Sequence, residues 1–191
     1  MSEKKIVVFL SGRGTNFRAI ADAIDRGEIP ATRIAAVFSD RADAAGLSEA
    51  KRRGLPAHAV PRPPGMSRRE HEREIRKLLD PLDPDLLCLA GYLRVLSPEF
   101  VSAYAGRVLN IHPSLLPKFP GLDAQRRALE AGETVSGCTV HFVDEGLDSG
   151  PIVLQASVPV LPEDDEEALS ARILEQEHRA YPEAIRKVLG L

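Results

Sequence analysis

The chain has no tryptophan and only two cysteines among its 191 residues, and its formal net charge is only −3. Cys88 and Cys138 both lie in apolar, strand-like runs, so we expect buried, reduced thiols, which are typical of a cytoplasmic protein. So small a net charge gives no support to a nucleic-acid or membrane partner. The first apolar run covers only residues 6–10, too short for a signal peptide or a membrane-spanning helix.

Spaced sets of His, Cys and acidic residues are also missing, so the sequence predicts no metal site. We find no repeat, linker or low-complexity segment. A hydrophobic fraction of 43% in a chain of this length is typical of one globular domain with a full core, here residues 1–191.

Apolar strand-like runs alternate with helical patterns in the first half of the chain. This rhythm predicts a single Rossmann-like α/β domain, with a mostly parallel twisted sheet and helices on both faces. After residue 121 the strands alternate more clearly, which favours an antiparallel portion in the C-terminal half. Expected strands are 5–10, 33–39, 57–60, 85–90, 107–109, 137–143 and 152–160; expected helices are 16–26, 42–53, 67–79, 123–131 and 165–189, the last interrupted at Pro182.

Asn110 and His112 stand two residues apart at the end of a buried strand, so their side chains are expected on the same face. An amide supplies donors for a developing oxyanion, and an imidazole can move a proton or carry positive charge beside it. The missing acid is expected in the loop that follows residue 143. From the residues alone, Asp144, Glu145 and Asp148 are all candidates.

A glycine-rich turn links the first strand to the first helix and carries Gly12, Gly14 and Asn16. Glycines let backbone N–H groups approach an anion, and a helix N-terminus favours negative charge. This pattern predicts a phosphate-binding loop, to which Thr15 and Asn16 add polar donors. The alternative is a tight strand-to-helix turn without a ligand.

The third glycine of the dinucleotide-binding fingerprint is absent, because Phe17 stands in its place. Asp40 follows the second strand, where an acidic residue binds the ribose in NAD-dependent enzymes. A dehydrogenase is therefore a minor alternative.

Five motifs occur in an order and spacing that resemble the folate-dependent formyltransferases, and most closely those that act on glycinamide ribonucleotide. The resemblance covers nearly the whole chain. Its motifs are residues 11–16, residues 90–97, the Asn-x-His-Pro-Ser-Leu-Leu-Pro run at 110–117, Leu-Asp-x-Gly-Pro at 147–151, and residues 175–178.

The resemblance implies formyl transfer from 10-formyltetrahydrofolate to the amine of glycinamide ribonucleotide, giving formylglycinamide ribonucleotide and tetrahydrofolate in de novo purine biosynthesis. Transfer would be direct, through a tetrahedral intermediate and without a metal. Asn110 would bind the oxyanion, and His112 would stabilise it or supply a proton. The Leu-Asp-x-Gly-Pro pattern selects Asp148 as the acid that pairs with His112 and holds a proton-shuttling water.

The resemblance also implies two sets of binding residues, one for each small-molecule substrate. The ribonucleotide would be bound mainly from the half at about 1–100, and folate binding and catalysis would come from about 101–191. Arg69 neighbours Arg68, so which arginine contacts folate stays open. We expect a monomer or weak homodimer. The implied ribonucleotide residues are Gly12, Arg13, Gly14, Thr15, Asn16 and Glu177; the implied folate residues are Arg68, Leu93, Arg94, Val95, Leu96, Asn110, Val143 and Asp144.

Two other functions compete with formyl transfer. A 10-formyltetrahydrofolate hydrolase would pass the formyl group to water; that family usually has His after the catalytic His and an extra N-terminal domain, whereas here Pro113 follows and the chain starts at the first strand. A non-catalytic folate or nucleotide sensor would not need Asn110, His112 and Asp148 together. One departure from the family concerns residues 123–125, where Asp123, Ala124 and Gln125 replace histidines.

Overall fold

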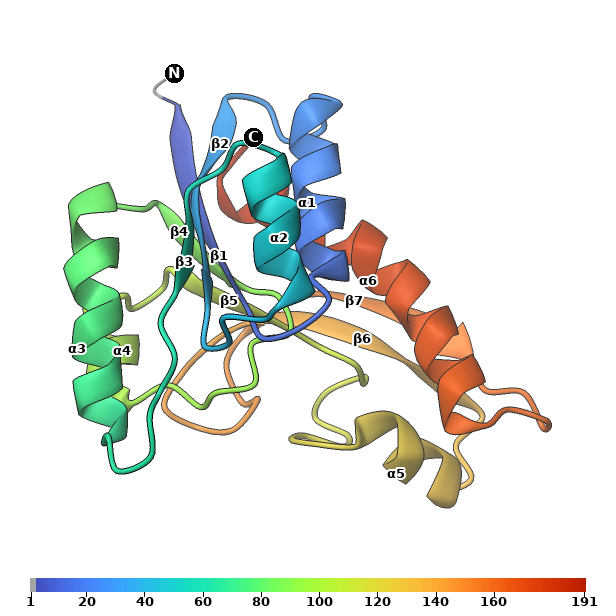
Figure 1. Ribbon diagram of the computed structural model, residues 1–191. Helices are drawn as coiled ribbons and strands as arrows, with labels where there is room; N and C mark the ends of the chain where they lie inside the picture. The colour runs from blue at the N-terminus through green and yellow to red at the C-terminus, as the bar shows by residue number, and fades with distance from the viewer. Residues whose placement is uncertain (1–2) are drawn as a thin grey trace.

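The computed structural model describes residues 3–191, and over these residues seven strands form one sheet (Figure 1). The strands are β1 (Lys4–Leu10), β2 (Thr32–Ser39), β3 (Ala57–Ala59), β4 (Leu86–Leu89), β5 (Val108–His112), β6 (Val135–Phe142) and β7 (Ile152–Pro159). Their order across the sheet is β3-β2-β1-β4-β5-β6-β7. The first five strands pair in parallel, whereas β6 and β7 pair antiparallel. The predicted mostly parallel sheet with an antiparallel C-terminal portion is confirmed.

Strand β1 lies inside the sheet, between β2 and β4, and is apolar on both faces. Ile6, Val8 and Leu10 point into one hydrophobic cluster, while Val7 and Phe9 point into another on the opposite face. All five side chains are at most 1% exposed. A continuous apolar run therefore gives a strand covered by helices on both sides.

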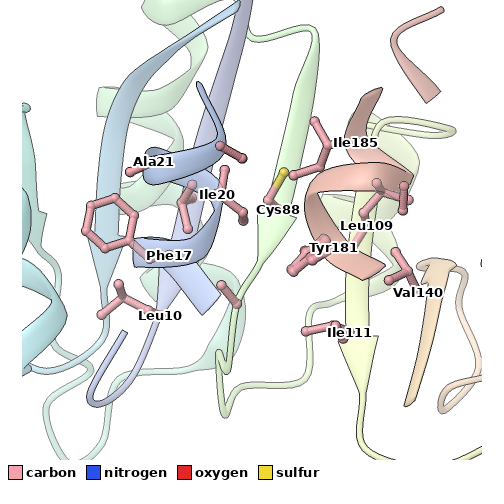
Figure 2. Packing of buried hydrophobic residues seen from close by; sticks show 14 of the residues in the cluster. Leu10, Phe17, Ile20, Ala21, Cys88, Leu109, Ile111, Val140, Tyr181 and Ile185 are labelled. Atoms are coloured by element: carbon pink, nitrogen blue, oxygen red, sulfur yellow. The ribbon is translucent and has the colours of Figure 1, made fainter. Parts of the chain in front are cut away.

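Helices cover both faces of the sheet (Figure 1). One face is covered by α1, α2 and α6, with Phe17, Leu47 and Tyr181 in their shared core; Figure 2 shows Phe17 and Tyr181 in that cluster. The opposite face is covered by α3 and α4, which contribute Ile75 and Phe100. The helices are α1 (Thr15–Asp25), α2 (Ala45–Arg52), α3 (Arg68–Leu79), α4 (Pro98–Ala103), α5 (Ala124–Glu130) and α6 (Glu166–Val188), with a short 3-10 helix η1 at Asp80–Leu82.

Helix α2 starts later than expected, whereas the ends of the other helices listed from the sequence lie within one residue of their predicted positions. Helix α2 begins at Ala45 instead of residue 42, because the preceding residues form a turn in which Arg41 pairs with Asp43. A capping box of Ser67 and Glu70 is present at the start of α3. Helix α6 runs through Pro182 without interruption. A buried apolar face holds this helix on the sheet, which outweighs the one backbone hydrogen bond that proline cannot make.

The strand order reverses between β1 and β4, because β2 and β3 lie on one side of β1 and the later strands on the other. In open parallel sheets, ligands bind beyond the carboxyl ends of the strands at such a reversal. The loops that follow β1 and β4 meet there: the backbone N–H of Ser11 donates to the carbonyl of Gly91 over 3.0 Å. The fold therefore positions a binding site at this edge before any side-chain chemistry is considered. In the described part of the chain, no helix combines the length and the apolarity needed to cross a membrane.

Candidate active site

Strand β5 carries the first two candidate catalytic residues on one face of the sheet. Leu109 and Ile111 point into the cluster beneath α1 and α6, so Asn110 and His112 point the opposite way. The predicted shared face is confirmed. Strand β6 runs antiparallel beside β5 and pairs Asn110 with His141. A second imidazole is thereby brought to the same face.

Both ring nitrogens of His112 lie beside protein oxygens. Its Nε2 is 2.8 Å from the carbonyl oxygen of Phe119, and its Nδ1 is 3.4 Å from Oδ2 of Asp148. Both neighbours are acceptors, so this geometry accommodates the doubly protonated imidazolium. The ring is only 5% exposed, and these two contacts fix its orientation.

The carboxylate of Asp148 lies beside both imidazoles, those of His112 and His141. Oδ2 accepts from the backbone N–H of Gly121 over 2.8 Å, and Oδ1 lies 3.6 Å from Nε2 of His141. Burial on its own would raise the pKa of Asp148. The nearby imidazole of His141, the hydrogen bond from Gly121 and the imidazole of His112 together outweigh burial and lower the pKa of Asp148 to about 2. Asp148 is therefore an anion throughout the neutral range.

The side chain of His141 orients the amide of Asn110. Its Nδ1 lies 2.9 Å from the carbonyl oxygen of Phe142, so Nδ1 carries the proton and Nε2 is an acceptor in the neutral ring. The Nδ2 of Asn110 lies 3.3 Å from this Nε2 and donates to it. The second amide hydrogen of Asn110 stays free for a ligand. His141 thus supports Asn110 from the neighbouring strand.

Two non-glycine residues in the loops around His112 have positive φ angles, which such residues seldom adopt. Phe119 has φ of 52° and Asp148 has φ of 50°, both in the left-handed region. The carbonyl of Phe119 binds His112, and the carboxylate of Asp148 faces it from the other side. Backbone strain of this kind persists only where surrounding contacts enforce it, and it concentrates at functional sites.

The loop from Gly12 to Asn16 leads into helix α1, which has no side-chain cap. The first backbone N–H groups of the helix are thus left for another acceptor. The two glycines have different roles. Gly14 has φ of 71°, and a Cβ there would lie 2.7 Å from the Cα of Gly46, whereas a Cβ on Gly12 would meet nothing within 4 Å. Gly14 therefore allows close packing on α2, and Gly12 leaves space for a ligand.

Next to this loop, Asn16 and Glu177 form a buried polar pair. The Nδ2 of Asn16 donates to Oε2 of Glu177 over 2.7 Å, and each residue is 7% exposed. Burial raises the pKa of Glu177, against the lowering effect of the bond from Asn16. The Oδ1 of Asn16 is buried and finds no hydrogen-bond partner among residues 3–191. The pair thus offers unused acceptor capacity to a ligand that carries hydroxyl or amine donors.

A cavity of about 180 Å³ lies between the start of α3 and the loop after β4. Four of the predicted folate residues, at 93–96, line it together with Arg68. The neighbouring Arg69 instead forms an ion pair with Glu99 on α4. The structure therefore favours Arg68 over Arg69 as the arginine of this cavity. The remaining lining residues, which the sequence did not single out as ligand contacts, are Arg62, His71, Glu72 and Tyr92.

The other three predicted folate residues are outside this cavity: Asn110 is on β5, and Val143 and Asp144 follow β6. Val143 packs against the α3 and α4 cluster, and its N–H donates to the carbonyl of Val108 over 2.9 Å. Asp144 accepts from Gly146 and Ser149 of its own loop, over 3.0 and 2.8 Å. Neither lines the 180 Å³ cavity. Two residues predicted to bind the ribonucleotide lie where α1 begins. Arg13 is exposed and Thr15 is half-buried.

Neither thiol is suited to act as a nucleophile. Both cysteines are free and buried. Burial raises the pKa of Cys88, and burial together with the charge of Glu177 raises the pKa of Cys138 to about 12. The reactive thiolate is therefore suppressed at neutral pH. Within residues 3–191 there is also no group of three or more His, Cys, Asp or Glu side chains arranged to hold a metal ion.

A half-buried strand-end amide, an imidazole and an ionised carboxylate lie together at the carboxyl edge of the sheet, an arrangement that can serve acyl transfer between small molecules. The formyl transferase family model matches residues 4–185, and the chain belongs to this family.

Several members of this family are similar to this chain over almost its whole length. A phosphoribosylglycinamide formyltransferase of Escherichia coli is 50% identical over 93% of this chain and 83% of its own length. A solved glycinamide ribonucleotide transformylase of Symbiobacterium toebii has a TM-score of 0.94 and 52% identity, covering 98% of this chain and 88% of its own. A trifunctional purine biosynthetic protein of Drosophila pseudoobscura is 48% identical over 95% of this chain, which spans only 13% of that longer protein.

The variant Asp148→Asn tests the buried charge. Because the pKa of Asp148 is lowered from an ordinary 3.8 to about 2, its charge stabilises the fold above the unfolded pKa, and this contribution is lost as pH falls toward 2. The wild type should be more stable than the variant by at most about 2 kcal/mol near neutral pH. Urea unfolding should show this difference shrinking by roughly half between about pH 5 and about pH 3.

The exposed acid of the same loop gives the matched control. Glu145→Gln should leave the unfolding free energy within about 0.5 kcal/mol of wild type over the whole range. A stability difference for Asp148→Asn that does not change with pH would contradict the assignment of a paired, buried charge.

Proposed function

We propose that this protein transfers the formyl group of 10-formyltetrahydrofolate to the amine of glycinamide ribonucleotide, a step of purine biosynthesis. The observation that carries this proposal is the convergence of Asn110, His112 and Asp148 at the carboxyl edge of the sheet. The names of relatives at about half identity over almost the whole chain support the same reaction.

In the proposed reaction, the amine of the ribonucleotide attacks the formyl carbon and the carbonyl electrons move onto oxygen. The free amide hydrogen of Asn110 binds this oxyanion, and one such donor is typically worth roughly 3–4 kcal/mol. The C–N bond to the folate then breaks, the amine proton leaves, and the folate nitrogen gains a proton. The formyl group is transferred directly, with no covalent intermediate on the protein and no metal.

His112 and Asp148 act on charge and protons. The imidazolium form of His112, held between Phe119 and Asp148, places positive charge beside the oxyanion. Asp148, ionised at neutral pH, is the acceptor toward which the amine proton moves, directly or through one water. His141 keeps the amide of Asn110 turned with its nitrogen toward the reacting group.

The two substrates are proposed to reach this centre from different sides. The Gly12–Asn16 loop and the N-terminus of α1 suit the phosphate, and Arg13 and Thr15 add donors. Glu177 would repel a phosphate, so we assign it and the free Oδ1 of Asn16 to the donors of the ribose and the glycyl amine.

The formyl-folate is assigned to the other side of the centre. Leu93, Val95 and Leu96 give apolar surface, Arg68 gives positive charge for the carboxylates of the folate tail, and Arg94 is assigned a place near the pteridine ring. Asn110 contacts the formyl group, and Val143 and Asp144 would close the pocket beside β5.

We also propose that residues 1–191 act as one domain. Ribonucleotide contacts come mainly from about 1–100, and catalytic and folate contacts mainly from about 101–191; Arg68, the 93–96 segment and Glu177 are the exceptions. We also propose that the protein is a monomer or weak homodimer. The free thiols of Cys88 and Cys138 support a cytoplasmic location.

The first test is whether loss of formyl groups from 10-formyltetrahydrofolate depends on glycinamide ribonucleotide. We expect consumption of formyl-folate only when the ribonucleotide is present, because the phosphate loop and Glu177 hold the acceptor amine. Tetrahydrofolate and formylglycinamide ribonucleotide should form in equal amounts. Equal turnover without the ribonucleotide would instead indicate the hydrolase.

The second test separates the roles of the two glycines in the phosphate loop. Gly12→Val places a side chain in open space, so it should raise the ribonucleotide KM by roughly tenfold or more while melting temperature and folate KM stay near wild type. Gly14→Val should lower stability instead, because its Cβ meets Gly46 and its φ is 71°. An unchanged ribonucleotide KM for Gly12→Val would exclude this loop as the phosphate site.

The third test uses two neighbouring arginines as a matched pair. Arg68→Gln should raise the KM for the formyl-folate by roughly tenfold, because a cavity-lining charge that faces the folate carboxylates is lost. Arg69→Gln removes the same charge from an exposed ion pair and should leave this KM within about twofold. The reverse pattern would contradict the assignment of the cavity.

A further inference from the structure

Asp40 is a buried carboxylate at the carboxyl end of β2, and the proposed reaction makes no use of it. It is 6% exposed, although it lies in the edge where the substrates are proposed to bind. In a dehydrogenase an acid at this place binds a ribose. Here both carboxylate oxygens are already occupied by protein donors. Its role must therefore be sought in those two contacts.

The two contacts of Asp40 both lead to the segment at 91–96 that lines the 180 Å³ cavity. Oδ1 accepts from the hydroxyl of Ser11 over 2.6 Å, and Oδ2 accepts from Nε of Arg94 over 2.6 Å. The same hydroxyl oxygen of Ser11 accepts from the backbone N–H of Leu93 over 2.9 Å. The carboxylate of Asp40 thus holds the side chain of Arg94 directly. It holds the backbone of Leu93 through the hydroxyl of Ser11.

The rest of the segment is attached by apolar contacts at its two ends. Tyr92 packs edge-on against Phe9 with ring centroids 5.4 Å apart, and Leu96 is buried in the same cluster. Between them, Leu93 and Val95 are 74% and 64% exposed. Because apolar contacts do not hold the middle of the segment, its conformation depends on Asp40 and Ser11.

We propose that Asp40 is a positioning residue for the folate side of the site: it holds the guanidinium of Arg94 and, through Ser11, the backbone of Leu93 in the arrangement that receives the formyl-folate. This inference rests on the proposed function. Asp40 touches neither substrate and takes no part in the chemical step. Its removal therefore weakens folate binding by making the segment mobile, not by removing a contact.

The experiment compares wild type with Asp40→Ala, Asp40→Asn and Ser11→Ala. Asp40→Ala should weaken tetrahydrofolate binding, measured by calorimetry, by roughly tenfold, because a charge-assisted and a neutral hydrogen bond are both lost. The KM for formyl-folate should rise in parallel, and kcat at saturation should stay within about threefold. Asparagine keeps an acceptor for Ser11 but loses the charge, so Asp40→Asn should give an intermediate effect.

Hydrogen exchange gives a readout that does not depend on any substrate. The amide of Leu93 should exchange faster in Asp40→Ala and in Ser11→Ala, since its acceptor is displaced or absent. The control is Asp43→Asn, which removes a carboxylate of the same loop that pairs only with exposed Arg41. It should change neither folate binding nor the exchange of Leu93.

The outcomes separate the inference from the function on which it rests. A wild type that binds tetrahydrofolate, with an Asp40→Ala variant that binds it equally well, overturns the role of Asp40 and leaves the function intact. Equal losses of folate and ribonucleotide affinity with a large fall in melting temperature would show a merely structural ion pair and overturn it too. A wild type that binds no folate overturns the proposed function itself.

Discussion

Strand β5 pairs in parallel with β4 on one side and antiparallel with β6 on the other, and the candidate active site depends on this change of direction. The parallel neighbour brings the carboxyl end of β5 to the edge where the loops after β1 and β4 meet. The antiparallel neighbour runs back from that edge and places His141 opposite Asn110. An all-parallel sheet would have needed a helical crossover there, and no strand would have returned beside Asn110.

Two aspartates, the buried Asp40 and the half-buried Asp148, then stabilise the loops on either side of β5. Asp148 binds the backbone of Gly121 and faces two imidazoles, while Asp40 binds Ser11 and Arg94. A buried carboxylate is tolerated only when donors surround it, so each fixes the loops that supply those donors. The polar groups of the site are thus held in place before a substrate arrives, which is the condition for strong electrostatic stabilisation of a transition state.

Local patterns sufficed to predict the alternating strands and helices, the antiparallel end of the sheet and the shared face of Asn110 and His112, because apolar periodicity and strand geometry determine all of these. The choice of Asp148 among three acids needed the family resemblance. Asp148 has a left-handed backbone conformation and accepts a hydrogen bond from Gly121, which is distant in sequence, and no local pattern predicts either feature.

Other features were beyond local reasoning for similar reasons. Whether Arg68 or Arg69 faces the cavity depends on Glu99, which lies on a different helix. The packing role of Gly14 depends on Gly46, and the continuity of α6 at Pro182 depends on the core beneath it. Each of these features depends on contacts between residues far apart in sequence, which local sequence patterns do not reveal.

The proposed chemistry also explains why the site can work without a protein nucleophile. Both thiols are buried with raised pKa values, so a covalent intermediate on cysteine is disfavoured. In the proposed arrangement, the N-terminus of α1 anchors the phosphate, the cavity beside α3 receives the folate, and Asn110 contacts the formyl group. Binding energy from such remote groups can align amine and formyl carbon, and that alignment alone can account for roughly 7–11 kcal/mol of a reaction barrier. Rigid loops matter because misplacing either substrate by about 1 Å can cost roughly a hundredfold in rate.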